Sequence, residues 1–180
     1  FGLVARAVGF DCRWVLDVTD HVWCEVWLPA QKRWVHADPC EAALDAPLLY
    51  EKGWGKKLSY VVSFGPHEAV DVARRYSADW AQTLRRRTAV KEGWLELTIA
   101  SLNEARQAAL PPPARAALAE RAAAEQQQLA RRHARALTAA ERKGRTTGAL
   151  EWRRARGELG AGAQEGPRAA VEVAKVARVC

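Results

Sequence analysis

HVWCEVWL, at residues 21–28, is a run of β-branched and aromatic residues that is typical of a β-strand. Similar runs lie on both sides of it, RWVLD at residues 13–17 and RWVHA at residues 33–37. Turn-like segments separate the three runs: Thr19-Asp20 comes before residue 21, and Pro-Ala-Gln occupies residues 29–31. The sequence therefore predicts three successive antiparallel strands. Five of the eight tryptophans precede residue 60, so we expect an aromatic core.

The rest of the first half offers two more candidate elements. Residues 58–64 (LSYVVSF) predict a further strand, which Gly65-Pro66 ends. Residues 69–76 (AVDVARRY) fit either a strand or a short helix. The first half therefore indicates a mainly antiparallel sheet.

After residue 79 the pattern becomes helical. Apolar residues follow a period of about 3.6 through residue 109, namely Trp80, Leu84, Trp94, Leu97 and Leu102. Three prolines at 111–113 break this helix, and residues 114–143 are strong helix formers with sparse leucines. Glycines and weak periodicity from residue 144 predict a loosely ordered tail. We therefore divide the chain into a sheet-containing core at 1–79, a helical extension at 80–143 and a tail at 144–180.

Composition excludes several classes of protein. The 180 residues are 49% hydrophobic and 27% charged, as in an ordinary globular domain, which excludes a wholly disordered or collagen-like chain. No apolar run reaches the ~18 residues that cross a bilayer, so a membrane-spanning protein is not expected. Residues 1–80 carry a net charge of −2 and residues 81–180 a net charge of +9. Because the chain has no methionine and opens on FGLVARAVGF, we expect it to be a fragment.

The cysteines do not predict a metal site or a disulfide framework. Cys12, Cys24, Cys40 and Cys180 form no Cys-x-x-Cys pair and have no metal-ligand spacing. No signal peptide precedes them, so reduced thiols in the cytosol or nucleus are expected.

His21 and Asp38 are the residues most suggestive of chemistry. His21 begins one predicted strand and Asp38 ends the next, and a spacing of 17 residues on a hairpin brings such positions side by side. A histidine held by a carboxylate is the base and its orienting partner in a nucleophilic triad. The alternative is a strand-end histidine with no catalytic role, beside an aspartate that begins the turn at Pro39. The spacing alone leaves both readings open.

Three segments add a resemblance. Residues 20–27 (DHVWCEVW), 33–41 (RWVHADPCE) and 47–64 (PLLYEKGWGKKLSYVVSF) closely resemble the catalytic domain of the cytoplasmic peptide:N-glycanase family. Residues 70–76 (VDVARRY) and 144–160 (GRTTGALEWRRARGELG) resemble later segments of that family. The resemblance implies an α+β, transglutaminase-like fold related to papain-like proteases, with an antiparallel sheet followed by C-terminal helices.

The resemblance also implies an activity and a site. Family members cleave the amide bond between asparagine and the first N-acetylglucosamine of an N-glycan with a Cys-His-Asp triad, in the removal of misfolded glycoproteins. His21 matches the general base and Asp38 matches the acid that orients it. Trp23 and Glu41 match positions that bind the sugar core, where the indole would stack on a pyranose and the carboxylate would accept hydroxyl hydrogen bonds. Core packing for Trp23 and a plain turn carboxylate for Glu41 are the alternatives.

The nucleophile has no counterpart in these residues. The family cysteine lies in a CGEWAN-like motif, and Phe1 aligns just after it, which places the nucleophile about seven residues upstream of Phe1. The chain by itself is therefore expected to be inactive. The zinc-binding cysteine pairs of the family would also lie upstream, so we expect no cofactor within this chain and zinc in the full-length protein.

The expected partners are N-glycosylated misfolded proteins, together with proteasome-shuttle or segregase proteins, in the cytoplasm and also the nucleus. Membrane and nucleic-acid partners are not expected. The rival interpretation is a non-catalytic transglutaminase-homology domain that binds DNA or a protein partner. The basic helices favour this rival, while His21, Asp38 and the charge of −2 across the sheet region oppose it.

The remaining histidines are weaker candidates. His36 precedes Asp38 by two residues and is expected to pack or form hydrogen bonds near the site. His67 and His133 are expected to be solvated, and the arginine runs at 85–87 and 131–132 are expected to lie on solvent-exposed helix faces.

Overall fold

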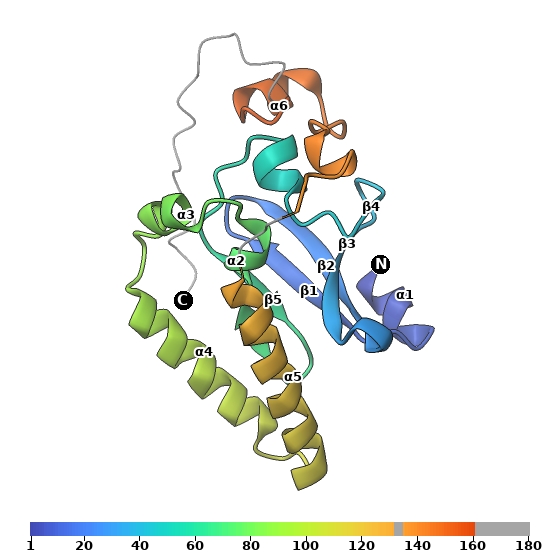
Figure 1. Cartoon of the computed structure of the whole chain (residues 1–180), viewed down its shortest axis with the longest axis vertical. Helices are drawn as coiled ribbons and strands as arrows, with labels where there is room; N and C mark the ends of the chain where they lie inside the picture. Colours follow the sequence, from blue (N-terminus) through green and yellow to red (C-terminus); the bar gives the residue numbers. More distant parts are fainter. Residues whose placement is uncertain (132–134, 161–180) are drawn as a thin grey trace.

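A six-stranded antiparallel sheet forms the centre of the molecule in the computed structural model, which describes residues 1–131 and 135–160. The strands are arranged in the order β4-β3-β2-β1-β5-β6, as Figure 1 shows in part. Their bounds are β1 Cys12–Asp17, β2 His21–Leu28, β3 Arg33–Asp38, β4 Ala43–Leu44, β5 Val61–Phe64 and β6 Ala69–Asp71. The three strands predicted from the opening segments are confirmed as the antiparallel neighbours β1, β2 and β3.

Helices surround the sheet on several sides (Figure 1). They are α1 Gly2–Ala7, α2 Ala73–Tyr76, α3 Trp80–Arg86, α4 Glu92–Gln107, α5 Pro112–Ala130 and α6 Leu150–Ala155, with short helical turns η1 Pro29–Gln31, η2 Leu49–Gly53 and η3 Ala140–Arg142. Helices α4 and α5 form a hairpin at one end of the molecule, and α6 lies at the opposite end. The segment 69–76, which fitted either a strand or a helix, contains one of each, β6 and α2.

The main core lies on one face of the sheet and is aromatic. Side chains alternate along a strand, so β2 turns His21, Trp23 and Glu25 to this face. Trp23 stacks on Tyr50 of η2, with ring centroids 4.3 Å apart, and meets Tyr76 of α2 edge-on at 4.7 Å. The predicted aromatic core is therefore present, and it joins the sheet to segments on both sides of residue 60.

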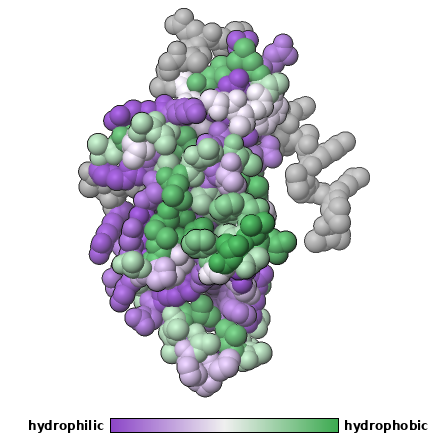
Figure 2. Space-filling view, turned by 90° about the vertical axis from the view of Figure 1, so that its right-hand side faces the viewer, coloured by the Kyte–Doolittle hydropathy of each residue, from purple (hydrophilic) through white to green (hydrophobic). Residues whose placement is uncertain are grey.

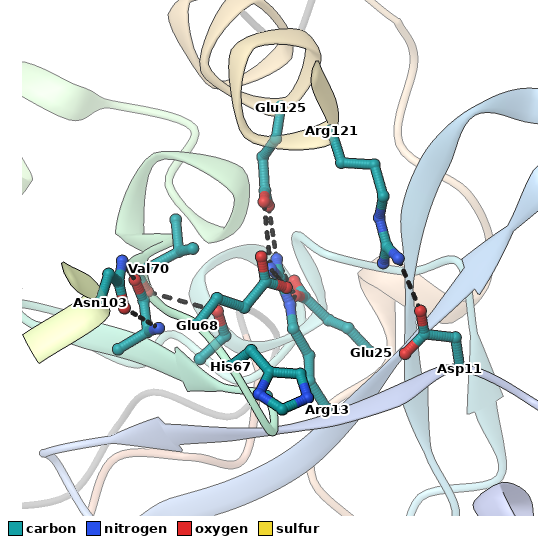
Figure 3. A network of polar contacts seen from close by, with 12 residues as sticks. Asp11, Arg13, Glu25, His67, Glu68, Val70, Asn103, Arg121 and Glu125 are labelled. Carbon is teal, nitrogen blue, oxygen red and sulfur yellow. Dashed lines mark hydrogen bonds and ion pairs between the residues drawn. The ribbon is translucent and has the colours of Figure 1, made fainter. Parts of the chain in front are cut away.

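Helix α5 is anchored to this face by buried charges. Figure 3 shows the carboxylates of Glu25, Glu68 and Glu125 gathered around the guanidinium of Arg13. Arg13 of β1 and Glu25 of β2 are cross-strand neighbours and form an ion pair. Glu125 of α5 forms a second ion pair with Arg13. Burial by itself raises the pKa of Glu25, but Arg13 and Arg75 outweigh it and hold that pKa at about 2. Helix α5 is therefore packed into the core, where its Leu129 also lies.

Two predictions for the second half need correction. The continuous helix expected at 114–143 ends at Ala130, and a separate turn, η3, follows at 140–142. The tail expected from residue 144 is wrong for residues 144–160, which contain α6 and the buried carboxylate of Glu158. Arg145 and Arg156 both bind that carboxylate, and Arg156 also pairs with Asp20 before β2. Ion pairs within the segment and to the sheet region therefore order a stretch with little periodicity of its own. The expected tail at 161–180 lies outside the described residues.

Apolar side chains are exposed on the surface at and beside α1. Figure 2 views the side of the molecule on which α1 lies and shows hydrophobic residues across the middle of that face. Leu3 and Val4 of α1 are among the most exposed apolar side chains, whereas Ala5 packs under the helix against Cys12 and Cys24. Within the described part of the chain, no helix is both long enough and apolar enough to cross a membrane.

Candidate active site

His21 and Asp38 are hydrogen-bonded in the structure. Cys24 of β2 pairs with Ala37 of β3, so the antiparallel ladder brings the beginning of one strand beside the end of the other. The Nε2 atom of His21 lies 2.8 Å from Oδ2 of Asp38. The proximity predicted from the 17-residue spacing is confirmed, and the catalytic roles of the two residues stay predictions.

Asp38 is held by four donors. Its Oδ1 accepts the backbone N–H groups of Cys40 and Glu41 at 3.0 and 3.3 Å. Its Oδ2 accepts the Tyr50 hydroxyl at 2.9 Å in addition to His21. Burial acts to raise the pKa of Asp38, but these hydrogen bonds prevail and lower it, so the group is a carboxylate at neutral pH.

This carboxylate fixes the tautomer of His21. An ionised Asp38 only accepts hydrogen bonds, so the proton between the two residues belongs to Nε2 of His21. In the neutral imidazole, Nδ1 then carries the free lone pair. The atom available to accept a proton from a nucleophile is therefore Nδ1.

The ring of His21 is enclosed by aromatic side chains. Tyr50 and Trp54 meet it edge-on, with ring centroids 5.2 and 5.0 Å away, and Trp23 lies 5.7 Å from it. The His21 side chain nevertheless keeps 9% of its surface accessible, while the Asp38 side chain keeps none. The His21–Asp38 pair is therefore accessible to solvent only through His21, and aromatic rings pack against the rest of the imidazole.

Tyr50 and His36 extend the network away from solvent. Nε2 of His36 lies 2.7 Å from the Tyr50 hydroxyl, and the backbone N–H of Ala46 donates to Nδ1 of His36 at 3.3 Å. Burial lowers the pKa of His36 to about 4, so its ring is neutral near pH 7. The predicted packing or hydrogen-bonding role of His36 is confirmed. Sequence reasoning missed Tyr50, because no spacing pattern ties residue 50 to residues 21 and 38.

Trp23 does not border a cleft. Its side chain is 2% exposed and lies in the main core, stacked on Tyr50. The expectation that its indole stacks on a sugar is therefore wrong. The physical reason is its position on a central strand, where η2 and α2 cover the face that it shares with His21.

Glu41 lies at the edge of the site, half-buried. It follows the turn that holds Asp38, and its carboxylate accepts a hydrogen bond from the Thr147 hydroxyl. The sugar-binding role assigned to Glu41 stays a prediction. Its contact with residue 147 was not foreseen, because that residue fell in the expected tail.

The segment at residues 144–158 covers this end of the sheet. The guanidinium of Arg145 lies 4.5 Å over the ring of Trp54, which in turn meets His21 edge-on. Arg156 binds the carbonyl of Thr19 at 2.8 Å and the carboxylate of Asp20 at 3.1 Å, immediately before His21. The segment therefore supports both loops that flank the His21–Asp38 pair.

The cysteines described by the structure do not face His21. Cys24 lies on the opposite face of β2 and packs with Cys12 beneath α1, and Cys40 is exposed. His67 is exposed as expected, and His133 lies outside the described residues. Residues 1–131 and 135–160 contain no group of three or more His, Cys, Asp or Glu side chains that could hold a metal ion.

Comparison with known families gives this geometry a context. A family model described as "Rad4 transglutaminase-like domain" matches residues 18–130, which include both His21 and Asp38. The chain belongs to this family. Its six-stranded antiparallel sheet with flanking helices is the transglutaminase-like α+β fold that the resemblance implied.

Individual proteins are also similar to the chain in sequence. A peptide-N(4)-(N-acetyl-beta-glucosaminyl)asparagine amidase of Gallus gallus is 49% identical over 160 residues, which cover 89% of this chain and 24% of that protein. The amidase of the same name from Homo sapiens is 48% identical over the same shares of both chains. The chain thus spans about a quarter of the length of these relatives. A solved Rad4-Rad23 complex crosslinked to undamaged DNA shows 20% identity and a TM-score of 0.48 over 72% of this chain and 33% of that chain, a likeness too distant to carry an argument.

Proposed function

We propose that this chain supplies the base and the orienting acid of an amidase that removes N-linked glycans from proteins. The observation that carries the proposal is the bond of 2.8 Å between His21 and a carboxylate with four donors. Relatives that bear the amidase name at 48–49% identity align over 89% of the chain and support the same activity. The whole activity belongs to a longer protein, of which this chain would be one part.

The geometry supports a Cys-His-Asp mechanism in which a thiol from outside these 180 residues is the nucleophile. Nδ1 of His21 accepts the thiol proton, and the sulfur adds to the side-chain carbonyl carbon of the glycosylated asparagine. The C–N bond breaks as His21 returns the proton to the departing glycosylamine. Water, deprotonated by His21, then adds to the thioester carbonyl. The C–S bond breaks, His21 returns the proton to the leaving sulfur, and aspartate remains in place of asparagine. Asp38 stabilises the imidazolium at both stages.

Further parts of the proposal concern the longer protein. We propose that its substrates are misfolded N-glycosylated proteins, that it works in the cytoplasm and also the nucleus, and that proteasome-shuttle or segregase proteins are its partners. Zinc would be held by cysteine pairs upstream of this chain, as the resemblance to the peptide:N-glycanase family implies. No catalytic step proposed for His21 or Asp38 depends on that metal.

The test is deglycosylation of a denatured N-glycoprotein, with the product asparagine site examined by mass spectrometry. We expect the 180-residue chain alone to be inactive, and the protein extended upstream with its nucleophilic cysteine to convert the glycosylated asparagine to aspartate. His21→Ala should abolish that conversion. Turnover by the chain alone that disappears with His21→Ala would show that one of its own cysteines is the nucleophile. Failure of the extended protein to convert any site would refute the amidase proposal.

A further inference from the structure

Asp38 shares one oxygen between two donors from different elements. Oδ2 receives His21 Nε2 from β2 at 2.8 Å and the Tyr50 hydroxyl from η2 at 2.9 Å. Tyr50 is completely buried, so no water competes for its hydroxyl. The strength and direction of the His21–Asp38 bond therefore depend on a third residue.

The direction of each hydrogen bond behind Asp38 is fixed by its neighbour. The N–H of Ala46 donates to Nδ1 of His36, so the proton of the neutral His36 ring is on Nε2. That N–H donates to the oxygen of Tyr50, whose own proton is then directed to Asp38. Since His36 is 1% exposed, the whole chain of bonds is shielded from solvent.

We propose that Tyr50, oriented by His36, is a positioning residue for the His21–Asp38 pair. It holds Oδ2 of Asp38 in line with the Nε2–H of His21, and it withdraws part of the carboxylate's charge by donating a hydrogen bond to the same oxygen. This inference rests on the proposed function for its catalytic consequence, and on the geometry alone for its effect on His21.

Tyr76 provides a matched comparison. It is also fully buried in the aromatic core, and its hydroxyl also donates to a buried carboxylate, Glu25, at 2.6 Å. Glu25 lies in the Arg13 network, where it accepts hydrogen bonds from Arg13 and Arg75. Tyr76→Phe therefore removes one buried tyrosine–carboxylate hydrogen bond, as Tyr50→Phe does, but takes no donor from Asp38.

The experiment compares Tyr50→Phe with Tyr76→Phe in the upstream-extended protein. Tyr50→Phe should lower kcat/KM about tenfold, the typical effect of one hydrogen bond to a charged group. It should also move the pH–kcat/KM profile to higher pH, because a carboxylate with one donor fewer stabilises the imidazolium more strongly. Tyr76→Phe should lower the melting temperature comparably and leave the pH profile in place. Equal pH profiles for Tyr50→Phe and the wild type would overturn the inference.

A second readout does not require activity. The hydrogen-bonded Nε2–H proton of His21 can be followed by NMR in the 180-residue chain, and Tyr50→Phe should shift this signal downfield while Tyr76→Phe should not. Site-specific 3-fluorotyrosine at position 50 keeps the ring and makes its hydroxyl a stronger donor, so it should shift the signal in the opposite direction. If Tyr50→Phe does not fold, the 3-fluorotyrosine variant tests the positioning role of Tyr50 by itself. If the extended protein never deglycosylates but both shifts occur, the proposed function fails and the positioning role stands; an unmoved signal refutes the positioning role whatever the activity.

Discussion

The buried imidazole of His36 should make the free energy of unfolding depend on pH. Burial holds its pKa at about 4 in the folded chain, against an ordinary value of 6.5. Between these two values the unfolded chain binds one proton more, so stability is lost as the pH falls from 6.5 toward 4. The full effect is on the order of 3 kcal/mol in the free energy of unfolding.

Urea denaturation at pH 7.0 and pH 4.5 measures this contribution. The wild type should lose stability over the interval, and His36→Gln should lose markedly less, because the variant has no buried imidazole to protonate. His67→Gln serves as the control, since His67 is exposed and should leave the pH dependence as it is. An identical pH dependence in wild type and His36→Gln would contradict this assignment.

How far the sequence predicts the site differs between residues. His21 and Asp38 flank turns on adjacent strands, so their spacing predicts their contact. The same strand pattern places Trp23 on the face of His21 but does not show what covers that face, and Tyr50 and Tyr76 cover it from segments beyond residue 48. Tyr50 itself could not be identified as an Asp38 partner, because the bond crosses between a strand end and a separate helical turn.

Among the elements, α5 depends on a buried carboxylate. Glu125 binds Arg13 and Arg75 at the face of the sheet and is 1% exposed. Glu125→Ala should cost about 3–5 kcal/mol in the free energy of unfolding, because it leaves buried guanidinium charge with fewer partners. Chemical denaturation measures it, and Glu120→Ala, at an exposed position of α5, should change stability by less than about 0.5 kcal/mol. Equal losses in the two variants would show that the network does not anchor the helix.

The segment at 144–158 depends in the same way on Glu158. This carboxylate is 1% exposed and binds Arg145 at 2.7 Å and Arg156 at 3.0 Å. Glu158→Ala should speed backbone hydrogen exchange within the segment and in the turn at Thr19-Asp20, while the central strands keep their protection. Glu151→Ala, exposed on α6, is the control. Unchanged exchange in Glu158→Ala would contradict the view that ion pairs order this segment.

The strands were predictable and this segment was not, for a physical reason. A strand can be recognised from the local alternation of apolar and polar residues and from β-branched residues, as at residues 21–28. Residues 144–160 are ordered by contacts with Asp20, Glu41 and Trp54, more than 90 positions away. Such contacts leave no periodic pattern in the local sequence from which the segment could be predicted.

For the whole molecule, the positive charge of the second half is less available than its count suggests. Three arginines of this half are paired with carboxylates of the first half, which the count of +9 leaves out: Arg87 with Asp71, Arg121 with Asp11 and Arg156 with Asp20. A charge of +9 over residues 81–180 therefore does not translate into an equally basic surface. This weakens the main support for the DNA-binding alternative.

The central claim is that Asp38 orients a catalytic His21, and one kinetic comparison tests it most directly. The comparison is kcat/KM for release of an N-glycan from a denatured glycoprotein by the upstream-extended protein, as wild type and as Asp38→Asn. The amide keeps the size of the side chain, but both oxygens of Asp38 accept hydrogen bonds, and the variant replaces one of them with an NH2 donor. An NH2 group toward His21 favours the wrong tautomer, and one toward the backbone N–H groups disrupts the turn, so kcat/KM should fall about 10³- to 10⁴-fold. Asp45→Asn, at the exposed Arg33 pair, should stay within about twofold of the wild type. An Asp38→Asn variant that folds normally and keeps kcat/KM within a few fold of the wild type would contradict the account.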